Sequence, residues 1–265
     1  MKDMAKVIAI TNQKGGVGKT TTACALCGGL AARGYKVLGV DLDPQGNFSF
    51  SLGADAESED SITIYDVFKG DATFEQAIQS TYTCDIVAAN ILLSGVELEL
   101  VHVGREHTLR EQLESLRDKY DYIIIDTPPA LNILTINAYT AADSLIVPMT
   151  PEILSLQGIS QLKETIFAVK KYYNQELELS GILLTKYNPR TTLAREVEEL
   201  AQIIARQLQT KVFENKISTS IAVAEAPAHK LTIMEYAPRA KATRDYIRFI
   251  DELFGGRNTI GTKDK

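Results

Sequence analysis

Residues 12–22 read Asn-Gln-Lys-Gly-Gly-Val-Gly-Lys-Thr-Thr-Thr and stand between an apolar run, residues 7–10, and a helix-like segment, residues 23–33. A strand, a glycine-rich turn and a helix in this order form a cradle for phosphate. Glycines let backbone N–H groups close around an anion, and the helix N-terminus adds the positive end of its dipole. Lys19 can reach the β- and γ-phosphates of a nucleotide, and the Thr20 hydroxyl can bind Mg²⁺. The stretch therefore predicts a nucleotide site directly after the first strand.

This loop departs from the usual phosphate-loop pattern at one position. The usual pattern has glycine five residues before Gly18, where this chain has Gln13, followed by Lys14. The cradle is still expected to form, because the other glycines of the loop remain. Lys14 elsewhere would be a solvated loop lysine, but inside this loop we favour a role in the site. The residues expected at the nucleotide phosphates are Lys14, Gly15, Gly16, Val17, Gly18, Lys19, Thr20 and Thr21.

Length and composition favour one α/β unit. The chain has 265 residues, 45% of them hydrophobic, which is enough for a sizeable core. We expect one domain over residues 1–265, with a core at about 6–254 and a polar tail at 255–265. No apolar run approaches the ~20 residues of a membrane helix, and the N-terminus shows no signal peptide. These observations predict a cytoplasmic protein.

The three cysteines agree with a reducing compartment. Cys24 and Cys27 form a C-x-x-C within the predicted first helix, and no second Cys or His pair stands nearby to complete a metal site. We therefore expect both to be buried helix cysteines.

Two aspartates follow the second predicted strand, residues 37–40. Asp41 and Asp43 are two residues apart, so on extended backbone they share a face. They lie at the carboxyl end of the strand, where α/β sheets bind ligands, and the pair could serve Mg²⁺ and an attacking water. The alternative is a turn or capping role for Asp43 before Pro44.

A third aspartate ends another buried strand. Three isoleucines at residues 123–125 precede Asp126, which is the arrangement of a Walker B carboxylate that holds Mg²⁺ through water. A capping role for Asp126 fits less well, because Thr127, Pro128 and Pro129 separate it from the next helix.

The order of strands and helices along the chain predicts a doubly wound, mostly parallel sheet with helices on both faces. The final helix is expected to bury Tyr246, Ile247, Ile250, Leu253 and Phe254. Residues 48–60 are expected to form a polar surface loop, with a short helix as an option. Strands are predicted at residues 7–10, 37–40, 85–87, 123–125, 144–148 and 179–184, and helices at 23–33, 64–68, 74–78, 109–116, 132–142, 156–171, 193–208 and 240–254.

Three motifs resemble those of one ATPase family. Residues 14–20 resemble the deviant Walker A loop of the ParA/MinD ATPases, and residues 41–47 and 126–129 are similar to further motifs of that family. The likeness extends over residues 6–254. It implies that Lys14 reaches the ATP of the partner subunit in a nucleotide-sandwich homodimer, and that catalysis uses Lys14, Lys19 and Asp43. In it, Asp41 helps to organise Mg²⁺ and Asp43 orients the water, so the metal-site residues are Thr20, Asp41 and Asp126.

The resemblance also places the adenine. Asn188 and Pro189 leave the carboxyl end of a predicted strand and would lie against the base, although a simple Asn-Pro turn is the alternative. Pro227 and Ala228 belong to a Glu-Ala-Pro segment whose backbone closes on the base in the family.

The charge distribution leaves DNA binding open. The net charge of −6 argues against a nucleic-acid protein, but residues 227–248 carry a local excess of bases. The family usually has arginines shortly before Glu-Ala-Pro, whereas residues 217–223 have none. A solvated basic helix face is an equal alternative to DNA contact. The candidate DNA-binding residues are Lys216, Lys230, Arg239, Lys241, Arg244 and Arg248.

The resemblance implies a ParA/Soj-type ATPase of plasmid or chromosome partition that uses ATP and Mg²⁺. It would bind double-stranded DNA non-specifically in the ATP state and lie at the nucleoid. Its ATPase activity would be weak unless stimulated by a ParB-like centromere-binding protein. Because the chain begins at its phosphate-loop strand, we expect no N-terminal operator-reading domain.

Particular residues argue against three alternatives. A MinD-like membrane ATPase needs a terminal amphipathic anchor, and residues 255–265 offer no apolar face. A redox relative needs cluster cysteines near residues 126–134, where there are none. A non-hydrolysing nucleotide switch is disfavoured by Asp43.

Overall fold

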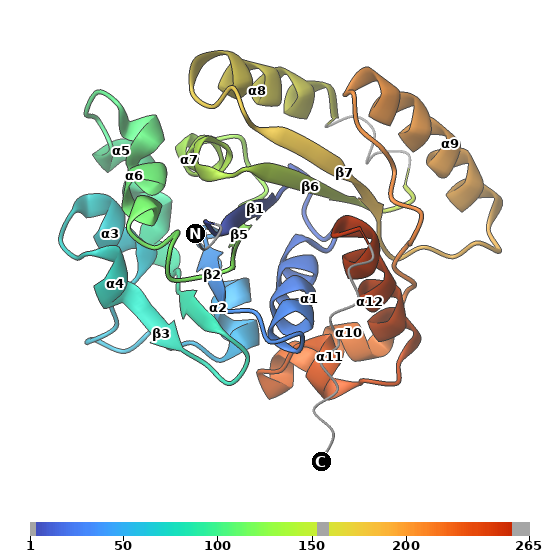
Figure 1. The fold of residues 1–265 in the computed structure, drawn as a ribbon, viewed down its shortest axis with the longest axis horizontal. Helices are drawn as coiled ribbons and strands as arrows, with labels where there is room; N and C mark the ends of the chain where they lie inside the picture. The colour runs from blue at the N-terminus through green and yellow to red at the C-terminus, as the bar shows by residue number, and fades with distance from the viewer. Residues whose placement is uncertain (1–3, 153–158, 256–265) are drawn as a thin grey trace.

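The computed structural model describes residues 4–152 and 159–255 and contains one seven-stranded sheet, in the order β3-β4-β2-β5-β1-β6-β7 (Figure 1). Five of the six neighbouring pairs are parallel, and only β3 runs antiparallel to β4. The predicted mostly parallel sheet is confirmed. The strands are β1 (Lys6–Ile10), β2 (Val37–Asp41), β3 (Ile78–Ser80), β4 (Asp85–Val87), β5 (Tyr122–Asp126), β6 (Ser144–Met149) and β7 (Glu178–Leu184).

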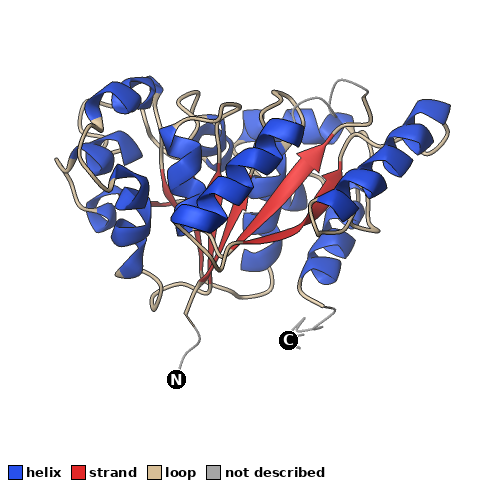
Figure 2. Cartoon of the chain, turned by 90° about the horizontal axis from the view of Figure 1, so that it is seen from above, coloured by secondary structure: helices blue, strands red, loops and turns tan. Residues whose placement is uncertain are grey.

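The central strands separate two hydrophobic cores. In β1, Ile8 and Ile10 face one core, while Val7 and Ala9 face the other. Both sets are fully buried, because helices cover both faces of the sheet. Figure 2 shows the strands enclosed between helices. Apolar residues at every position are typical of such a two-sided parallel strand.

The helices divide between the two faces as a doubly wound fold requires. One core contains residues of α1 (Lys19–Ala31), α2 (Asn47–Leu52), α11 (Ile233–Tyr236) and α12 (Lys241–Leu253), with α10 (Ile221–Glu225) packed against it. The other core receives α3 (Ile64–Lys69), α4 (Phe74–Ala77), α5 (Val96–Glu99), α6 (Thr108–Glu114), α7 (Ile133–Ala141), α8 (Ile159–Tyr172) and α9 (Thr192–Gln207).

Helix α1 is buried on nearly every side, which explains why its sequence has no polar face. Two glycines allow its neighbours to approach closely. A Cβ at Gly28 would lie 2.5 Å from Thr232 Oγ1, and one at Gly29 would lie 2.3 Å from Ile250 Cδ1. Cys24 and Cys27 are buried in this helix and free, as predicted. No cluster of three or more His, Cys, Asp or Glu side chains within residues 4–152 and 159–255 is placed to hold a metal ion by itself.

Several predicted boundaries and burials are wrong. Helix α1 begins at Lys19 rather than residue 23, because Gly18 takes the left-handed conformation that lets the helix begin. The short helix allowed within residues 48–60 is α2, but its Phe48 is fully buried rather than on the surface. Ile78 belongs to β3 rather than to a helix. Ile247 is 38% exposed, and Phe249 is buried in its place.

Several short helices were not predicted, and two predicted segments lie partly outside the described residues. The short helices η1 (Ile91–Gly95), α5, η2 (Arg105–His107), α10, η4 (Ala226–His229) and α11 escaped prediction, because segments of three to five residues carry too few positions for a periodic pattern. The predicted start of the helix at residues 156–171 and most of the predicted tail lie outside the described residues. Among the helices of residues 4–152 and 159–255, none is long and apolar enough to cross a membrane.

Candidate nucleotide site

The glycine-rich loop lies at the carboxyl end of β1, where the chain changes direction along the sheet. The crossover after β1 leads to β2 on one side, and the crossover after β5 leads to β6 on the other. Such switch points are where open α/β sheets bind ligands. Gly16 and Gly18 have φ angles of 72° and 88°, and among the described residues no side chain caps the start of α1. The first N–H groups of α1 are thus available to an anion.

Two side chains that the motifs did not reveal hold this loop in place. The Asn12 side chain donates to the Pro148 carbonyl (2.8 Å) and accepts from the Lys14 N–H (3.0 Å). Thr185 Oγ1, from the end of β7, donates to the carbonyl of Val17 at 2.7 Å. Asn12 stands inside the motif stretch and could have been suspected, whereas Thr185 is 168 residues from its partner.

Lys19 is buried at the centre of the loop, with only 7% of its surface exposed. Its ammonium donates to the Lys14 carbonyl at 3.3 Å. Burial lowers the pKa of Lys19, and the nearby charges of Asp126 and Asp43 oppose that shift. A buried ammonium of this kind is suited to a phosphate ligand, whose charge would offset the loss of hydration.

Thr20 and Asp126 meet as the motif logic predicts. Thr20 Oγ1 donates to Asp126 Oδ2 at 2.6 Å. The other oxygen, Asp126 Oδ1, is buried and has no hydrogen-bond partner among the described residues. Burial, followed by the charge of Asp41, raises the pKa of Asp126. An orphaned carboxylate oxygen beside a hydroxyl fits Mg²⁺, which commonly uses one or two carboxylates and completes its shell with water and phosphate oxygens.

Asp41 is fully buried, and protein donors occupy both of its oxygens. Oδ1 accepts from the Asp43 N–H at 3.0 Å, and Oδ2 accepts from the Ser49 N–H and hydroxyl at 2.9 and 2.7 Å. Burial is the main reason that the pKa of Asp41 rises to about 7. Asp41 therefore holds the backbone of the Asp43 loop and the start of α2 together. Ser49 is a site residue that the sequence did not reveal, although it lies only two positions beyond the second motif.

Asp43 makes the turn interaction that was considered for it, and its role toward an attacking water stays a prediction. Its Oδ1 accepts from the Gln45 N–H at 3.0 Å, which is the expected turn interaction. The side chain also lines a cavity of about 620 Å³ shared with the phosphate loop. The other residues of this cavity include Gly15, Gly16, Gly18, Lys19, Thr20, Thr21, Asn47, Phe50, Lys186, Val223, Ala226 and Pro227.

The residues predicted at the adenine are only partly brought together. Pro227 lines the cavity, next to Ala226, and Lys186 does so from the end of β7. Asn188, Pro189 and Ala228 are not part of its lining. Asn188 accepts a hydrogen bond from the Arg190 N–H at 3.1 Å, as in a simple Asn-Pro turn. Contact of these residues with the base stays a prediction.

The chain is similar in sequence to several known proteins. A family model described as an AAA domain matches residues 5–179. The sporulation initiation inhibitor protein Soj of Bacillus subtilis (strain 168) is 42% identical over 253 residues, covering 94% of this chain and 98% of Soj. The chromosome partitioning protein ParA of Caulobacter vibrioides (strain NA1000 / CB15N) is 40% identical over 253 residues, covering 94% and 93%. The chain belongs to the ParA/Soj family.

A solved structure extends the likeness to the ligands. Cobyrinic acid a,c-diamide synthase from Mycobacterium smegmatis, with bound ADP and magnesium, has a TM-score of 0.82 at 36% identity, covering 95% of this chain and 94% of that one. The chain therefore has the P-loop NTPase fold. As a ParA/Soj family ATPase, it hydrolyses nucleotide and uses ATP and Mg²⁺. The individual site residues rest on the geometry described above.

In this ParA/Soj family ATPase, Lys14 lies against the end of β6. Its ammonium donates to Glu152 Oε2 of the same chain. This hydrogen bond lowers the pKa of the Glu152 carboxyl. Glu152 is a further residue that the sequence did not reveal, since 138 positions separate it from Lys14.

The predicted DNA-binding residues fall into two groups. Lys216 pairs with Glu198 at 2.6 Å and lies over the ring of Tyr187, so its charge is already partnered. The other bases are exposed. Lys241 is the first residue of α12, and Arg244 and Arg248 follow it by three and seven positions, so the three side chains share one face of the helix. The exposed set is Lys230, Arg239, Lys241, Arg244 and Arg248.

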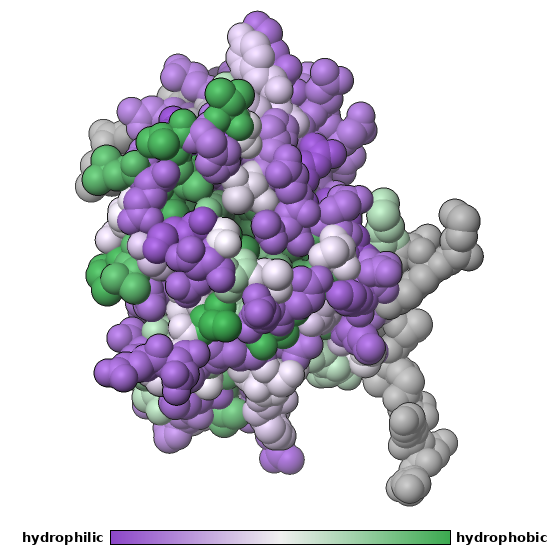
Figure 3. Space-filling model, turned by 90° about the vertical axis from the view of Figure 1, so that its left-hand side faces the viewer, coloured by the Kyte–Doolittle hydropathy of each residue, from purple (hydrophilic) through white to green (hydrophobic). Residues whose placement is uncertain are grey.

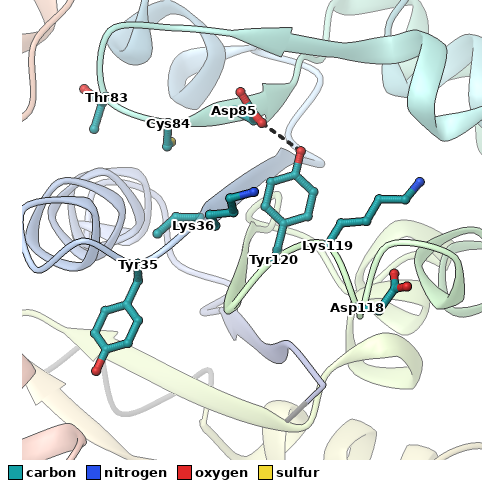
Figure 4. A pocket seen from close by; sticks show the side chains of 9 residues that line it. Tyr35, Lys36, Thr83, Cys84, Asp85, Asp118, Lys119 and Tyr120 are labelled. Atoms are coloured by element: carbon teal, nitrogen blue, oxygen red, sulfur yellow. Dashed lines mark hydrogen bonds between the residues drawn. The ribbon is translucent and has the colours of Figure 1, made fainter. Parts of the chain in front are cut away.

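A second cavity, of about 550 Å³, lies at the amino ends of β2 and β4, away from the phosphate loop (Figure 4). Its polar groups are already partnered in part. Tyr120 donates to Asp85 at 2.8 Å, and Lys119 pairs with Glu75 at 3.3 Å. We therefore place the nucleotide site of this ParA/Soj family ATPase in the first cavity.

Replacing Gly46 by alanine should destabilise the Asp43 loop. Gly46 has a φ angle of 62°, and a Cβ there would lie 2.8 Å from the backbone oxygen of Ala89. Gly70 is a matched control with a φ angle of 79° and open space around it. We expect Gly70→Ala to lower the free energy of unfolding by about 1 kcal/mol, and Gly46→Ala by about 1–2 kcal/mol more. Urea denaturation measures both, and equal losses would show that the Ala89 contact is unimportant.

Proposed function

We propose that this chain is a Mg²⁺-ATP-dependent, dimerising partition ATPase that binds double-stranded DNA non-specifically in its ATP state. Hydrolysis would be slow unless a ParB-like centromere-binding protein stimulates it. The observation that carries the proposal is a nucleotide site and an exposed basic face on the same chain, whose relatives are named for chromosome partitioning. The protein would work in the cytoplasm, at the nucleoid.

The nucleotide site supports hydrolysis by positioning and charge. The N–H groups of the loop and the Lys19 ammonium would bind the phosphates, and Thr20 and Asp126 would hold Mg²⁺. The cation supplies charge neutralisation at the transferring phosphoryl group. Asp43 would orient the attacking water, and Asp41 keeps Asp43 in place through its backbone N–H.

The position of Lys14 supports a dimeric site. Lys14 opens the loop and is half-buried, and its ammonium lies on Glu152 rather than over the phosphate cradle of its own chain. In a two-fold sandwich, each Lys14 would reach the ATP of the partner subunit, as the family resemblance implies. Lys14 would then leave Glu152 when it binds the ATP of the partner subunit.

The basic face of α12 supports contact with DNA phosphates. Lys241, Arg244 and Arg248 project from one helix face, and Arg239 precedes it. Such a face would bind the phosphate backbone without reading the base sequence. Lys216 is the weakest of the predicted contacts, because Glu198 already neutralises it.

The wild-type chain should bind random-sequence duplex DNA with ATP and much less with ADP, and the double variant Arg244→Ala/Arg248→Ala should bind about tenfold more weakly. The slope of log affinity against log salt should fall by about 0.9 for each DNA phosphate that the variant no longer neutralises. Arg195→Ala/Arg206→Ala, on exposed positions of α9, is the matched control. Filter binding across a salt series measures these effects.

The same assay separates partition from a MinD-like membrane function. Anionic liposomes replace DNA in a second arm, again with ATP and with ADP. Binding to liposomes and not to DNA would contradict the partition proposal. Equal losses in the α9 and α12 variants would contradict the assignment of the α12 face.

A further inference from the structure

The nucleotide cavity has a second lysine besides Lys19. Among the described residues, the charged side chains that line this cavity are Lys19, Asp43 and Lys186. Lys186 lies just beyond β7, and no motif of the sequence assigns it a role. The phosphates of a nucleotide carry several negative charges, so a further positive charge in the lining is a candidate for binding them.

An exposed lysine is by itself an ordinary feature of a protein surface. Figure 3 shows one face of this molecule, and hydrophilic groups cover much of it. Charged side chains on such a surface are usually solvated. A binding role for Lys186 is supported by two further features, which are its backbone conformation and its connection to the phosphate loop.

The backbone of Lys186 has an unusual conformation for its place in the fold. Among the described residues, the non-glycine residues with positive φ are Lys186 (49°), Gln209 (54°) and Lys230 (55°). Gln209 and Lys230 follow the ends of α9 and η4, where left-handed residues are common. Lys186 instead follows a strand and lines the cavity. Strained residues of this kind cluster at ligand sites.

Hydrogen bonds on both sides hold Lys186 in this conformation. Before it, the Thr185 hydroxyl donates to the Val17 carbonyl of the phosphate loop at 2.7 Å. After it, the Tyr187 N–H donates to the Ile217 carbonyl at 2.8 Å. The position of Lys186 relative to the loop is therefore set before a nucleotide binds, which lowers the entropic cost of a contact.

The charges around Lys186 are consistent with a role toward a ligand. Among residues 4–152 and 159–255, no salt bridge joins Lys186 to a carboxylate. The hydrogen bond from Lys14 is the main cause that lowers the pKa of the Glu152 carboxyl, and the charge of Lys186 adds to it. We propose that Lys186 binds the phosphate chain of the nucleotide in its own chain, as a second positive charge beside Lys19.

This inference rests on the proposed function only in placing ADP and ATP in the cavity. Lys186 enters the cavity from β7 rather than from the Asp43 loop, so we expect it to contact the nucleotide equally before and during hydrolysis. A contact of this kind lowers KM for ATP and leaves kcat unchanged.

Lys186→Met should weaken ADP binding about tenfold, because a charged contact is lost. The difference from the wild type should shrink as the salt concentration rises, since ions screen the contact. Lys186→Arg keeps the positive charge and should retain most of the affinity. Lys171→Met changes an exposed lysine on α8 and is the matched control. Isothermal titration calorimetry with ADP and Mg²⁺ measures these affinities, and wild-type affinity in Lys186→Met would overturn the inference.

A double variant separates nucleotide binding from a role through Glu152. In a Glu152→Gln background, Lys186→Met should still weaken ADP binding about tenfold, because the contact is with the nucleotide. If the loss disappears in this background, Lys186 acts by neutralising Glu152, and the inference is wrong.

A glycine variant separates nucleotide binding from a role in the turn. Lys186→Gly should raise the urea midpoint of unfolding, because glycine adopts the left-handed conformation without strain, and yet weaken ADP binding. Gln209→Gly is the control for strain, and should raise the midpoint without changing the affinity. ADP binding at wild-type affinity by Lys186→Gly would assign Lys186 to the turn alone.

Hydrolysis supplies a measurement that a structural role would not produce. Lys186→Met should raise KM for ATP about tenfold and leave kcat within about twofold of the wild type, at matched protein concentration. A fall in kcat with an unchanged KM would contradict the inference. Loss of DNA binding by the wild type would contradict partition but leave the ADP titrations as they are. A wild-type chain that does not bind ADP would overturn both.

Discussion

Asp43→Ala should reduce ATP hydrolysis about 100-fold or more while leaving ATP binding nearly unchanged. The loop glycines, Lys19, Thr20 and Asp126 are untouched in this variant, so the phosphates and Mg²⁺ keep their ligands. Only the carboxylate that faces the cavity is lost. Single-turnover hydrolysis measures the rate, and fluorescence titration with an ATP analogue measures binding.

The structure supplies a control for this variant, because Asp43 also accepts a hydrogen bond from the Gln45 N–H. Asp43→Asn keeps an oxygen acceptor for that N–H and removes only the charge. If both variants lose hydrolysis equally, the carboxylate itself is required. Wild-type rates in Asp43→Asn would assign the side chain to the turn alone. A wild-type chain that binds ATP without hydrolysing it, even with its partner, would instead indicate a nucleotide switch.

Lys14→Ala should abolish the ATP-dependent dimer and reduce hydrolysis about 100-fold or more, because the partner's ATP loses a positive charge at its phosphates. Light scattering after size-exclusion chromatography reports the dimer at matched protein concentration. Glu152→Gln is the control, since it removes the negative charge that pairs with Lys14 within its own chain. This variant should keep the dimer or favour it. An intact dimer and full hydrolysis in Lys14→Ala would contradict the role in trans.

Mixing two inactive variants gives a sharper test of the same role. In a mixed dimer of Lys14→Ala and Asp43→Ala subunits, the site on the Lys14→Ala subunit keeps Asp43 and receives Lys14 from its partner. Up to about a quarter of wild-type hydrolysis should return, because half of the dimers are mixed and each has one complete site. No recovery, with mixed dimers present, would mean that Lys14 acts within its own chain.

The sequence predicted those parts of the site whose structure depends on residues adjacent in the chain. The glycine loop follows its strand directly, and Asp126 ends the strand whose isoleucines identify it as buried. Their chemistry depends on local backbone geometry and on the rule that parallel strands bring their carboxyl ends to one edge. Thr20 and Asp126 therefore meet at 2.6 Å, although 106 positions separate them.

The parts that were missed depend on contacts between distant segments. Thr185 reaches Val17, and Glu152 reaches Lys14, through the neighbouring strands β7 and β6. No periodic pattern carries such pairings, because a single Thr or Glu after a strand is an ordinary residue. The burial of α12 shows the same limit. Helical spacing favoured Ile247 for the core, but Phe249 is buried instead, and its ring packs edge-on against Phe213 with 4.9 Å between ring centroids.

The close packing of α1 connects the nucleotide site to the basic face of α12. α1 starts at the phosphate loop and touches α12 through Gly29 and Ile250, and Thr22 Oγ1 lies 3.3 Å from Tyr246 Oη. A displacement of α1 would therefore be transmitted to α12, because closely packed interiors transmit strain. Closure of a dimer over its two nucleotides would set the distance between the two α12 faces. That distance would then match, or fail to match, the spacing of phosphates along a duplex.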